Sequence, residues 1–284
     1  MQVSRLQRTL CTAVTNSAQL LSRQHALDSE AVHNARKALK RARAGLRLLR
    51  DAENRSFYIS DNARLRDAAK PLGRLRDEVV LLEKVGGIRS KATGGVNRKL
   101  LAALQHRIEA DCRRLHTEAR DARLPQAKAK EILDVAGGIK RRPLAHQKSG
   151  AILAGLKRIY RKGRAAMKLA GGKPTDLNLH EARKQSKYLF HALELVMNDG
   201  GDRARKLLKR SKSVGEKLGD DHDLVLLEER LSKLTSQPSR ARTALSNHLD
   251  KHRRKLQKKA FRRARVLYAK KPKAFAALLA SNLD

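Results

Sequence analysis

Residues 32–49 read VHNARKALKRARAGLRLL, and residues 179–196 read LHEARKQSKYLFHALELV. Both stretches contain the pattern His-x-x-Arg-Lys-x-x-Lys, which begins at His33 in the first and at His180 in the second. An α-helix turns by about 100° per residue, so the basic residues of each pattern project within roughly 60° of one direction, and apolar residues project to the opposite side. The sequence therefore predicts two amphipathic helices, each with an apolar face and a basic face.

The basic face of the first helix has no carboxylate to balance it. Most surface helices mix charges of both signs, and like charges along one face repel each other unless an anionic partner lies against them. On this geometry the first basic face consists of His33, Arg36, Lys37, Lys40 and Arg47. The second basic face consists of His180, Arg183, Lys184, Lys187 and His191.

The overall composition indicates a polyanionic partner. The chain has 284 residues and a formal net charge of +37, which is extreme for a folded protein. Its aromatic residues are four Phe and four Tyr, with no Trp. Proteins that bind single-stranded nucleic acid stack bases on aromatic side chains, and this chain has few of them. The hydrophobic content of 40% is enough for a folded core, so we do not expect a disordered chain.

Neither cysteine usage nor hydropathy suggests a metal site, a disulfide or a membrane segment. The two cysteines, Cys11 and Cys112, are too few and too far apart for a zinc site or a disulfide framework. Charged and polar residues interrupt the N-terminal segment, and no stretch approaches the 18 or more apolar residues of a membrane span. We expect a soluble, cytoplasmic protein without a cofactor or bound metal.

Hydrophobic periodicity predicts two sets of four helices. We assign residues 1–125 to an N-terminal four-helix bundle, 126–147 to a connection with a short helical run, and 148–284 to a C-terminal four-helix bundle. Glycine pairs and prolines are interpreted as breaks between helices. The expected helices cover residues 3–24, 29–50, 62–84, 96–123, 149–169, 177–197, 202–234 and 239–269. A short apolar tail follows Pro272 and is expected to close one end of the second bundle.

A second pair of motifs supports an internal duplication. Residues 72–81 (LGRLRDEVVL) parallel residues 218–227 (LGDDHDLVLL), with the shared pattern Leu-Gly-x-x-x-Asp followed by apolar residues. The histidine motifs are 147 residues apart, and these motifs are 146 residues apart. Two motifs in the same order at nearly the same offset predict an all-α protein of two similar bundles related by an approximate two-fold axis, with their basic faces meeting in a shared central pore.

At these motif pairs the chain resembles the CHAD family of helical domains, and the similarity extends to about Tyr268. The resemblance implies paired four-helix bundles around a basic pore that binds inorganic polyphosphate. It nominates His33, Arg36, Lys37, Lys40, Arg43 and Arg47 in the first half. It nominates His180, Arg183, Lys184 and Lys187 in the second half. The second motif lacks an arginine that family members often carry before the tyrosine, because Gln185 and Ser186 precede Lys187 here.

The segments around the second motif pair add further candidates. Arg66, Lys70 and Arg74 share a helix side with Asp77, and Lys209 and Lys212 are the analogous candidates near Asp223. The run from Asp220 to Asp223 resembles a metal site, but its counterpart in the first half keeps only the final aspartate. We therefore favour a role for Asp77 and Asp223 in orienting basic side chains through charge-assisted hydrogen bonds.

The sequence thus leads to three hypotheses about function. The first is a non-enzymatic protein that binds polyphosphate and attaches to or organises polyphosphate granules. The second is a general nucleic-acid-binding protein that uses the same charge, and the third is a metal-dependent phosphohydrolase that uses residues 220–223. The remaining basic clusters, at residues 140–142 and 253–263, receive no specific role.

Overall fold

The computed structural model describes residues 3–23, 27–50, 55–91, 97–142, 150–197, 202–234 and 239–280. All regular secondary structure in these ranges is helical, which confirms the predicted all-α class. The first half contains α1 (Val3–Ser22), α2 (Ser29–Leu49), α3 (Arg55–Lys91), α4 (Arg98–Asp121) and α5 (Leu124–Arg141). The second half contains α6 (Gly150–Gly172), α7 (Asp176–Val196), α8 (Asp202–Leu234), α9 (Arg240–Leu267) and α10 (Pro272–Ala280).

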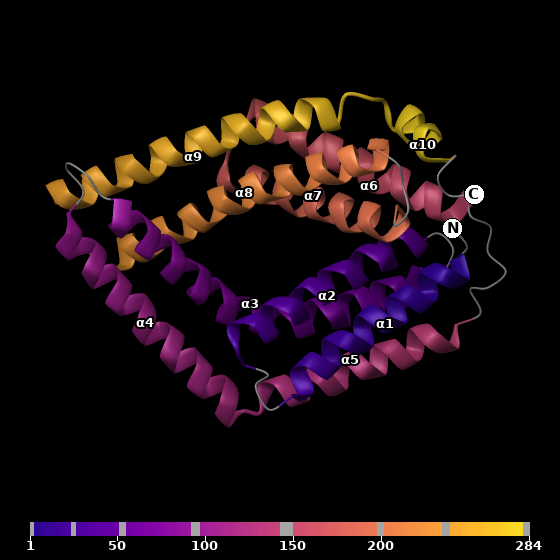
Figure 1. The fold of residues 1–284 in the computed structure, drawn as a ribbon, viewed down its shortest axis with the longest axis horizontal. Coiled ribbons are helices and arrows are strands. Elements are labelled where there is room, and N and C mark those ends of the chain that lie inside the picture. The colour runs from indigo at the N-terminus through magenta and orange to yellow at the C-terminus, as the bar shows by residue number, and fades with distance from the viewer. Residues whose placement is uncertain are drawn as a thin grey trace.

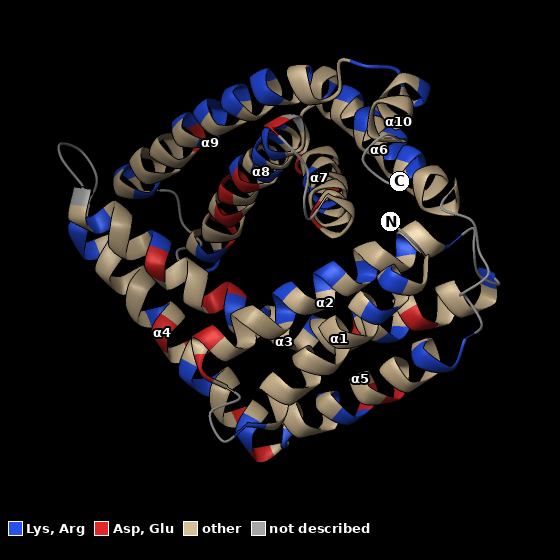
Figure 2. Cartoon of the chain, turned by 45° about the vertical axis from the view of Figure 1, so that its right-hand side comes forward, with Lys and Arg blue, Asp and Glu red and all other residues tan. Residues whose placement is uncertain are grey.

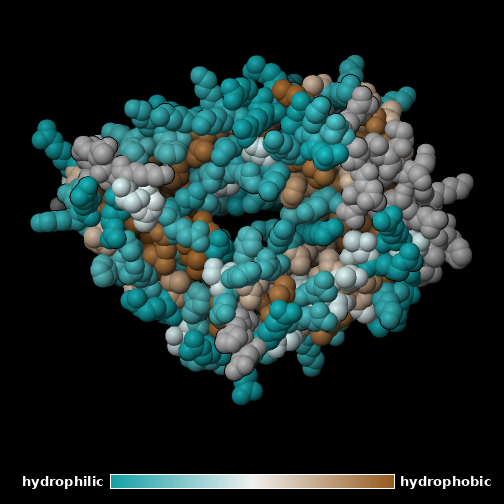
Figure 3. Space-filling model, viewed as in Figure 1, coloured by the Kyte–Doolittle hydropathy of each residue, from teal (hydrophilic) through white to brown (hydrophobic). Residues whose placement is uncertain are grey.

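The helices surround an opening near the centre of the molecule. In Figure 1, α1, α2 and α5 lie below the opening and α6 to α10 lie above it, while α3 and α4 meet α8 and α9 at one end. The space-filling view in Figure 3 shows a gap in the same place, bordered mainly by hydrophilic residues. The two halves therefore contact each other at both ends of the molecule and leave a space between the contacts.

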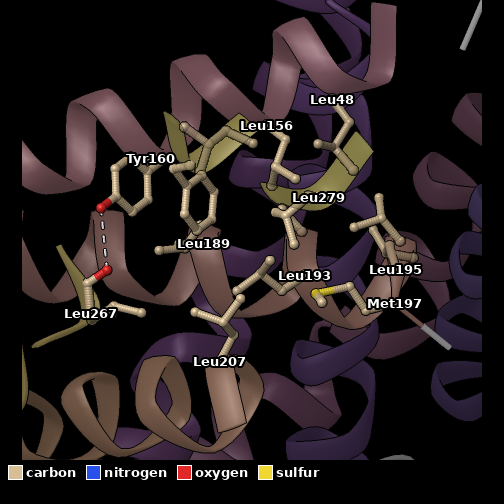
Figure 4. Close-up of a cluster of buried hydrophobic side chains, with 14 of the residues drawn as sticks. Leu48, Leu156, Tyr160, Leu189, Leu193, Leu195, Met197, Leu207, Leu267 and Leu279 are labelled. Atoms are coloured by element: carbon tan, nitrogen blue, oxygen red, sulfur yellow. Dashed lines mark hydrogen bonds between the residues drawn. The ribbon is translucent and has the colours of Figure 1, made fainter. Parts of the chain in front are cut away.

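Each end is held by a hydrophobic cluster that combines both halves. At one end, Leu48 of α2 packs with Leu156 of α6 and Leu193 of α7 (Figure 4). At the other end, Leu81 of α3 packs in one cluster with residues of α8 and α9, including Leu227. Because both clusters take side chains from both halves, the opening is fixed on two sides by buried apolar contacts.

One close helix crossing positions α2 against the second half. A Cβ added at Gly155 of α6 would overlap the backbone of Leu48 in α2, so this crossing requires glycine. The buried faces of α2 and α7 are those predicted, because Ala35 and Leu39 of α2 and Ala182 and Leu189 of α7 are fully buried. The basic faces of both helices consequently turn away from the cores.

The segment predicted as a connection, residues 126–147, differs from the expectation. It contains most of α5, whose residues Ile132 and Ile139 are fully buried in the core formed by α1, α2 and α3. The reversal of the chain before it occurs at Arg123, which has a positive φ of 46°, and Pro125 lies in the first turn of α5. Among the described residues, the first half therefore includes α5 as a fifth helix of its core. The internal duplication itself stays a prediction.

Glycine pairs did not interrupt helices where we expected breaks. Gly86 and Gly87 lie inside α3, residues 137–138 lie inside α5, and α6 extends through Gly171 to Gly172. A glycine in a helix costs about 1 kcal/mol relative to alanine, and packing of the surrounding apolar face outweighs this cost. The glycine pair at residues 94–95 lies outside the described residues.

Candidate functional site

The space between the halves contains a cavity of about 460 Å³, which we call the central cavity. It is bounded by α2 and α3 of the first half and by α7 and α8 of the second half. Figure 2 shows the blue Lys and Arg segments of α2 and the red Asp and Glu segments of α8 in this part of the molecule. The charged residues and histidines that line it are His33, Arg36, Lys37, Lys40, Arg76, Asp77, Arg183, Lys187, His191, Lys212, Glu216, Asp220 and Asp223.

Two lysines from different halves, Lys40 and Lys187, line this cavity. Burial, followed by the charge of Lys187, lowers the pKa of Lys40 to about 7. Burial, followed by the charge of Arg183, lowers the pKa of Lys187 to about 8. Buried cations with low pKa values indicate positive charge that the protein itself does not neutralise. An anion in the central cavity would relieve this repulsion.

Each Leu-Gly-x-x-x-Asp motif positions the arginine of the histidine motif, which lies on the preceding helix. In the first half, a Cβ at Gly73 would lie 2.5 Å from Nη1 of Arg36, so the guanidinium rests directly on α3 at this glycine. One turn later, Asp77 lies 3.8 Å from Nη2 of Arg36. The glycine and the aspartate of the motif therefore act together. The glycine leaves space for the guanidinium, and the aspartate attracts its positive charge.

The second half has the same arrangement with looser contacts. A Cβ at Gly219 would lie 3.7 Å from Nε of Arg183. Asp223 attracts Arg183 electrostatically, while burial raises the pKa of Asp223. Asp77 and Asp223 thus act on the arginines through their charge, at ion-pair distance in the first half, and the predicted charge-assisted hydrogen bonds are not among these contacts.

A second cationic cavity lies beyond the crossing of α2 and α7. This outer cavity has a volume of about 430 Å³ and is bounded by α2, α3, α6 and α7. Its walls contain Arg43, Arg47, Arg50, Tyr58, Asn62, Arg66, Arg158, Ile159, Lys162, Glu181, Lys184, Gln185 and Tyr188.

Several contacts order the side chains of the outer cavity. The guanidinium of Arg47 lies 3.7 Å from the ring centroid of Tyr188, in a cation–π contact that joins α2 to α7. Nη2 of Arg158 donates a hydrogen bond of 2.5 Å to the carbonyl oxygen of Arg47. Nε of Arg43 donates to Oδ1 of Asn62 at 3.2 Å. These arginines are thus held in place before any ligand binds.

A groove between α2 and α3 connects the two cavities. It shares Arg36 and Lys40 with the central cavity, and Arg43 and Arg66 with the outer cavity. Lys70 and Gly73 also line it. The basic residues of α2 from residue 33 to residue 47 thus form one continuous cationic track, about 21 Å long at the helical rise of 1.5 Å per residue.

Most of the residues predicted for the site line the central cavity, the outer cavity or the groove. The central cavity contains seven of them: His33, Arg36, Lys37, Lys40, Arg183, Lys187 and Lys212. The outer cavity contains Arg43, Arg47, Arg66 and Lys184, and the groove contains Lys70.

Three predicted residues lie elsewhere. Arg74 is exposed and follows Gly73 by one residue, so it is rotated by about 100° away from the side that faces Arg36. Lys209 is exposed and lines none of these three cavities. His180 is exposed and contacts His222 instead, with ring centroids 4.9 Å apart.

The structure adds residues that the sequence reasoning did not select for the site. Arg76 enters the central cavity from between the glycine and the aspartate of its motif. His191, which the sequence places on the basic face of its helix without nominating it as a ligand-binding residue, lines the central cavity, is buried and hydrogen bonds with Glu194 at 3.1 Å. In the outer cavity, α6 contributes Arg158 and Lys162. These two are four residues apart, and this spacing is the signal that could have identified them.

The acidic run at residues 220–223 is engaged in ion pairs. Asp220 accepts a hydrogen bond from Nζ of Lys84 at 2.7 Å and from Nζ of Lys217 at 3.3 Å. Asp221 pairs with Arg253 at 3.2 Å. Within the part of the chain that the structure describes, no group of three or more His, Cys, Asp or Glu residues is arranged to hold a metal ion.

The fold is similar to those of two proteins of known structure. The structure is similar to that of PptA from Streptomyces chartreusis, with a TM-score of 0.67 and 17% sequence identity, covering 94% of this chain and 98% of that one. It is also similar to the crystal structure of the CHAD domain from the plant Ricinus communis, with a TM-score of 0.56 and 19% identity, covering 96% and 90% of the two chains. At these identities the likeness concerns the fold. No curated protein sequence matches the chain.

A family model gives the assignment from the sequence itself. The model described as CHAD domain matches residues 5–232, which include both histidine motifs and both Leu-Gly-x-x-x-Asp motifs. None of the described helices has the length and apolar character needed to cross a membrane. The match covers well over half of the sequence, and the chain therefore belongs to the CHAD domain family.

Proposed function

We propose that this protein binds inorganic polyphosphate along the cationic track that runs from the central cavity through the groove to the outer cavity. The family is associated with polyphosphate binding, and the charges of this chain suit such a ligand. Binding requires no chemical step, so we propose a non-enzymatic role in which the protein attaches to polyphosphate or organises it in granules.

The observation that carries this proposal is the pair of lysines in the central cavity. Lys40 and Lys187 come from different halves, and burial together with neighbouring positive charge lowers the pKa of both, through Lys187 at Lys40 and through Arg183 at Lys187. A fold that holds such cations together at the expense of stability is typical of a binding site, because the ligand supplies the missing counter-charge.

The shape of the track favours a linear polymer of phosphates over a nucleic acid. Successive Arg and Lys side chains can neutralise successive phosphates, and each arginine can bind two oxygens at once. Few aromatic rings are present to stack bases. Phe190 lines the central cavity, Tyr58 lines the outer cavity, and the ring of Tyr188 in the outer cavity is already covered by Arg47.

The test is a binding measurement on the variant Lys40→Gln/Lys187→Gln. We expect affinity for long-chain polyphosphate, measured by calorimetry at moderate salt, to fall about 100-fold or more, because two charge-assisted contacts are lost. The matched control is Lys99→Gln/Arg113→Gln, which removes two exposed charges from α4. If the control loses as much affinity as the cavity variant, net charge explains the binding and the proposal is wrong.

Competition distinguishes polyphosphate from nucleic acid as ligand of the track. We expect unlabelled RNA or DNA to displace bound polyphosphate poorly at equal phosphate concentration. If nucleic acid displaces polyphosphate equally well, and if the cavity variant also loses its affinity for nucleic acid, the track is a general nucleic-acid site. Release of orthophosphate with magnesium or manganese, lost in Asp223→Ala, would instead support a phosphohydrolase.

A further inference from the structure

Helix α9 carries an excess of positive charge that the proposed function does not use. Its 28 residues include eleven Lys and Arg residues and one acidic residue, Asp250. It begins after residue 232, where the match to the family model ends. In Figure 1 it runs along the outer edge of the molecule, and Figure 2 shows the blue segments that follow its length.

Six of these cations form a row on the solvent side of α9, which we call the α9 ridge. At about 100° per residue they project within roughly 100° of one another, opposite the buried residues Leu249, Leu256 and Ala260. All six are exposed, and none forms an ion pair with any residue that the structure describes. The α9 ridge consists of Lys251, Arg254, Lys255, Lys258, Arg262 and Arg265.

The corresponding helix of the first half shows that the fold does not need this charge. Helix α4 follows the helix with the first Leu-Gly-x-x-x-Asp motif, as α9 follows the helix with the second. It has six Lys and Arg residues and four acidic residues. Its cations are partly paired, as in the contacts of Arg114 with Glu118 at 2.9 Å and of Arg107 with Asp111 at 3.8 Å.

The positive charges of the α9 ridge repel each other. Lys251 and Lys255, Arg254 and Lys258, and Lys258 and Arg262 are like-charge pairs at the i,i+4 spacing, which destabilises a helix. Mixed charges, as on α4, would give solubility without this repulsion. A polyanion lying along the α9 ridge would remove it.

We propose that the α9 ridge is a second binding surface, and that its partner is the phosphate backbone of double-stranded nucleic acid, contacted without regard to base sequence. The row from residue 251 to residue 265 is straight and about 21 Å long, and a convex helix of this kind fits against a duplex groove. A rigid duplex presents its phosphates in a fixed array. A flexible polyphosphate chain would lose more conformational entropy than a rigid duplex when it is ordered along a single helix.

Other polyanions fit the α9 ridge less well. The large hydrophobic side chain exposed on α9 is Val266, so the helix has no Trp, Phe or Leu to insert into a membrane interface. Its single aromatic residue, Phe261, packs against the core of the second half, so the helix offers no platform for unpaired bases. None of the six ridge residues lines the central or outer cavity, so the two surfaces can be tested separately.

The experiment compares three variants of the full chain. The ridge variant is Lys255→Gln/Lys258→Gln/Arg262→Gln. The control variant, Lys99→Gln/Arg113→Gln/Arg120→Gln, removes the same charge from exposed positions of α4. The cavity variant is Lys40→Gln/Lys187→Gln. Each is titrated against a labelled DNA duplex of about 20 base pairs over a salt series, with fluorescence anisotropy as the readout.

We expect the ridge variant to lose duplex affinity about ten-fold or more and to reduce the slope of log K against log salt by about 2–3, since each lost phosphate contact contributes about 0.9. The control and cavity variants should bind duplex nearly as well as the parent, and the ridge variant should still bind polyphosphate. A conservative variant, Lys255→Arg/Lys258→Arg, should also retain duplex binding, which separates loss of charge from misfolding.

Three results would overturn the proposal. The parent protein does not bind duplex, or the control variant loses as much affinity as the ridge variant, or the cavity variant loses duplex binding while the ridge variant keeps it. Loss of polyphosphate binding in the ridge variant would assign the α9 ridge to the polyphosphate track instead. Binding of vesicles rich in anionic lipid, lost in the ridge variant while duplex binding is retained, would make the surface a membrane contact.

Discussion

The two halves of the molecule hold the same motif arginine in different ways. In the first half, Arg36 rests on Gly73 and lies 3.8 Å from Asp77. In the second half, Nε of Arg183 is buried and has no hydrogen-bond acceptor among the described residues. A buried donor without a partner is costly, so Arg183 gains more from a phosphate oxygen than Arg36 does. Similar sequence patterns can therefore produce one arginine already engaged by its own fold and another that awaits its ligand.

The same asymmetry extends to the histidines. His33 lies near Arg76, whose charge contributes, after burial, to lowering the pKa of His33. At the matching position of the second half the sequence has His222, which contacts His180 and whose pKa burial lowers to about 4. The first half thus places one more permanent cation at the cavity, whereas His222 is not among the residues that line it and is neutral at pH 7.

The largest effect that tests this comparison is the loss of polyphosphate affinity on replacing each arginine. We expect about a 10–100-fold loss for Arg36→Gln and a greater one for Arg183→Gln, because Nε of Arg183 donates to no acceptor among the residues that the structure describes. Calorimetric titration of both variants measures the difference. The variants Arg36→Lys and Arg183→Lys keep the charge and serve as controls. A larger loss at Arg36 would contradict the interpretation that Arg183 depends more on its ligand.

The pH dependence of binding separates the two lysines. The pKa of Lys40 is about 7 and that of Lys187 about 8, so both lose protons between pH 6.5 and pH 9 in the free protein. Polyphosphate binds the protonated forms, so its affinity should fall by about 10-fold or more across this range, with proton uptake on binding at pH 8. Lys40→Arg, which stays charged, should flatten the profile more than Lys187→Arg. A parent profile that is flat between pH 6.5 and pH 9 would show that these lysines do not contact the ligand.

Stability should change in the opposite direction to affinity. The folded-state pKa of Lys40 lies below its unfolded value, so the unfolded chain binds more protons between pH 7 and 10.5, and the free energy of unfolding should rise with pH across this window. Lys40→Met removes the buried charge and should stabilise the ligand-free protein by about 1–3 kcal/mol at pH 7 while weakening binding. Lys187→Met should stabilise it less, because its pKa is less depressed.

Thermal or urea unfolding of Lys40→Met and Lys187→Met, without ligand, gives this comparison. Lys212→Met is a suitable control, because this exposed lysine also lines the central cavity and is paired with Glu216 at 3.8 Å. If Lys40→Met is destabilised relative to the parent, the lysine contributes packing to the fold that outweighs its electrostatic cost.

The sequence predicted the parts of the site that depend on helical periodicity. The faces of α2 and α7 follow from spacing alone, because buried Leu39 and Leu189 fix the rotation of each helix and the motif cations must then lie opposite. The start of α7 follows an equally local rule, since Oγ1 of Thr175 accepts from the backbone N–H of Asn178. Such local rules need no knowledge of the partner helix.

The remaining parts of the site depend on contacts between distant segments. The outer cavity exists because Gly155 lets α6 approach the backbone of α2, which brings Arg158 beside Arg47. His180 faces solvent because α7 presents Arg183 and Lys187 to the cavity, whereas on α2 the motif histidine His33 reaches it. Neither outcome can be obtained from one helix at a time, since each depends on the crossing of two helices.

The smallest effect concerns the glycines that support the two arginines. In Gly73→Ala, the new methyl group would lie 2.5 Å from Nη1 of Arg36, so the guanidinium must move away from α3 and from Asp77. In Gly219→Ala, the methyl group would lie 3.7 Å from Nε of Arg183, an ordinary contact that requires no movement. Alanine also favours a helix over glycine by about 1 kcal/mol. We therefore expect Gly219→Ala to stabilise the protein with little change in polyphosphate affinity, and Gly73→Ala to weaken binding a few-fold with a smaller gain in stability. Paired unfolding and binding curves would show this difference, and equal behaviour of the two variants would mean that the position of Arg36 on α3 does not matter for binding.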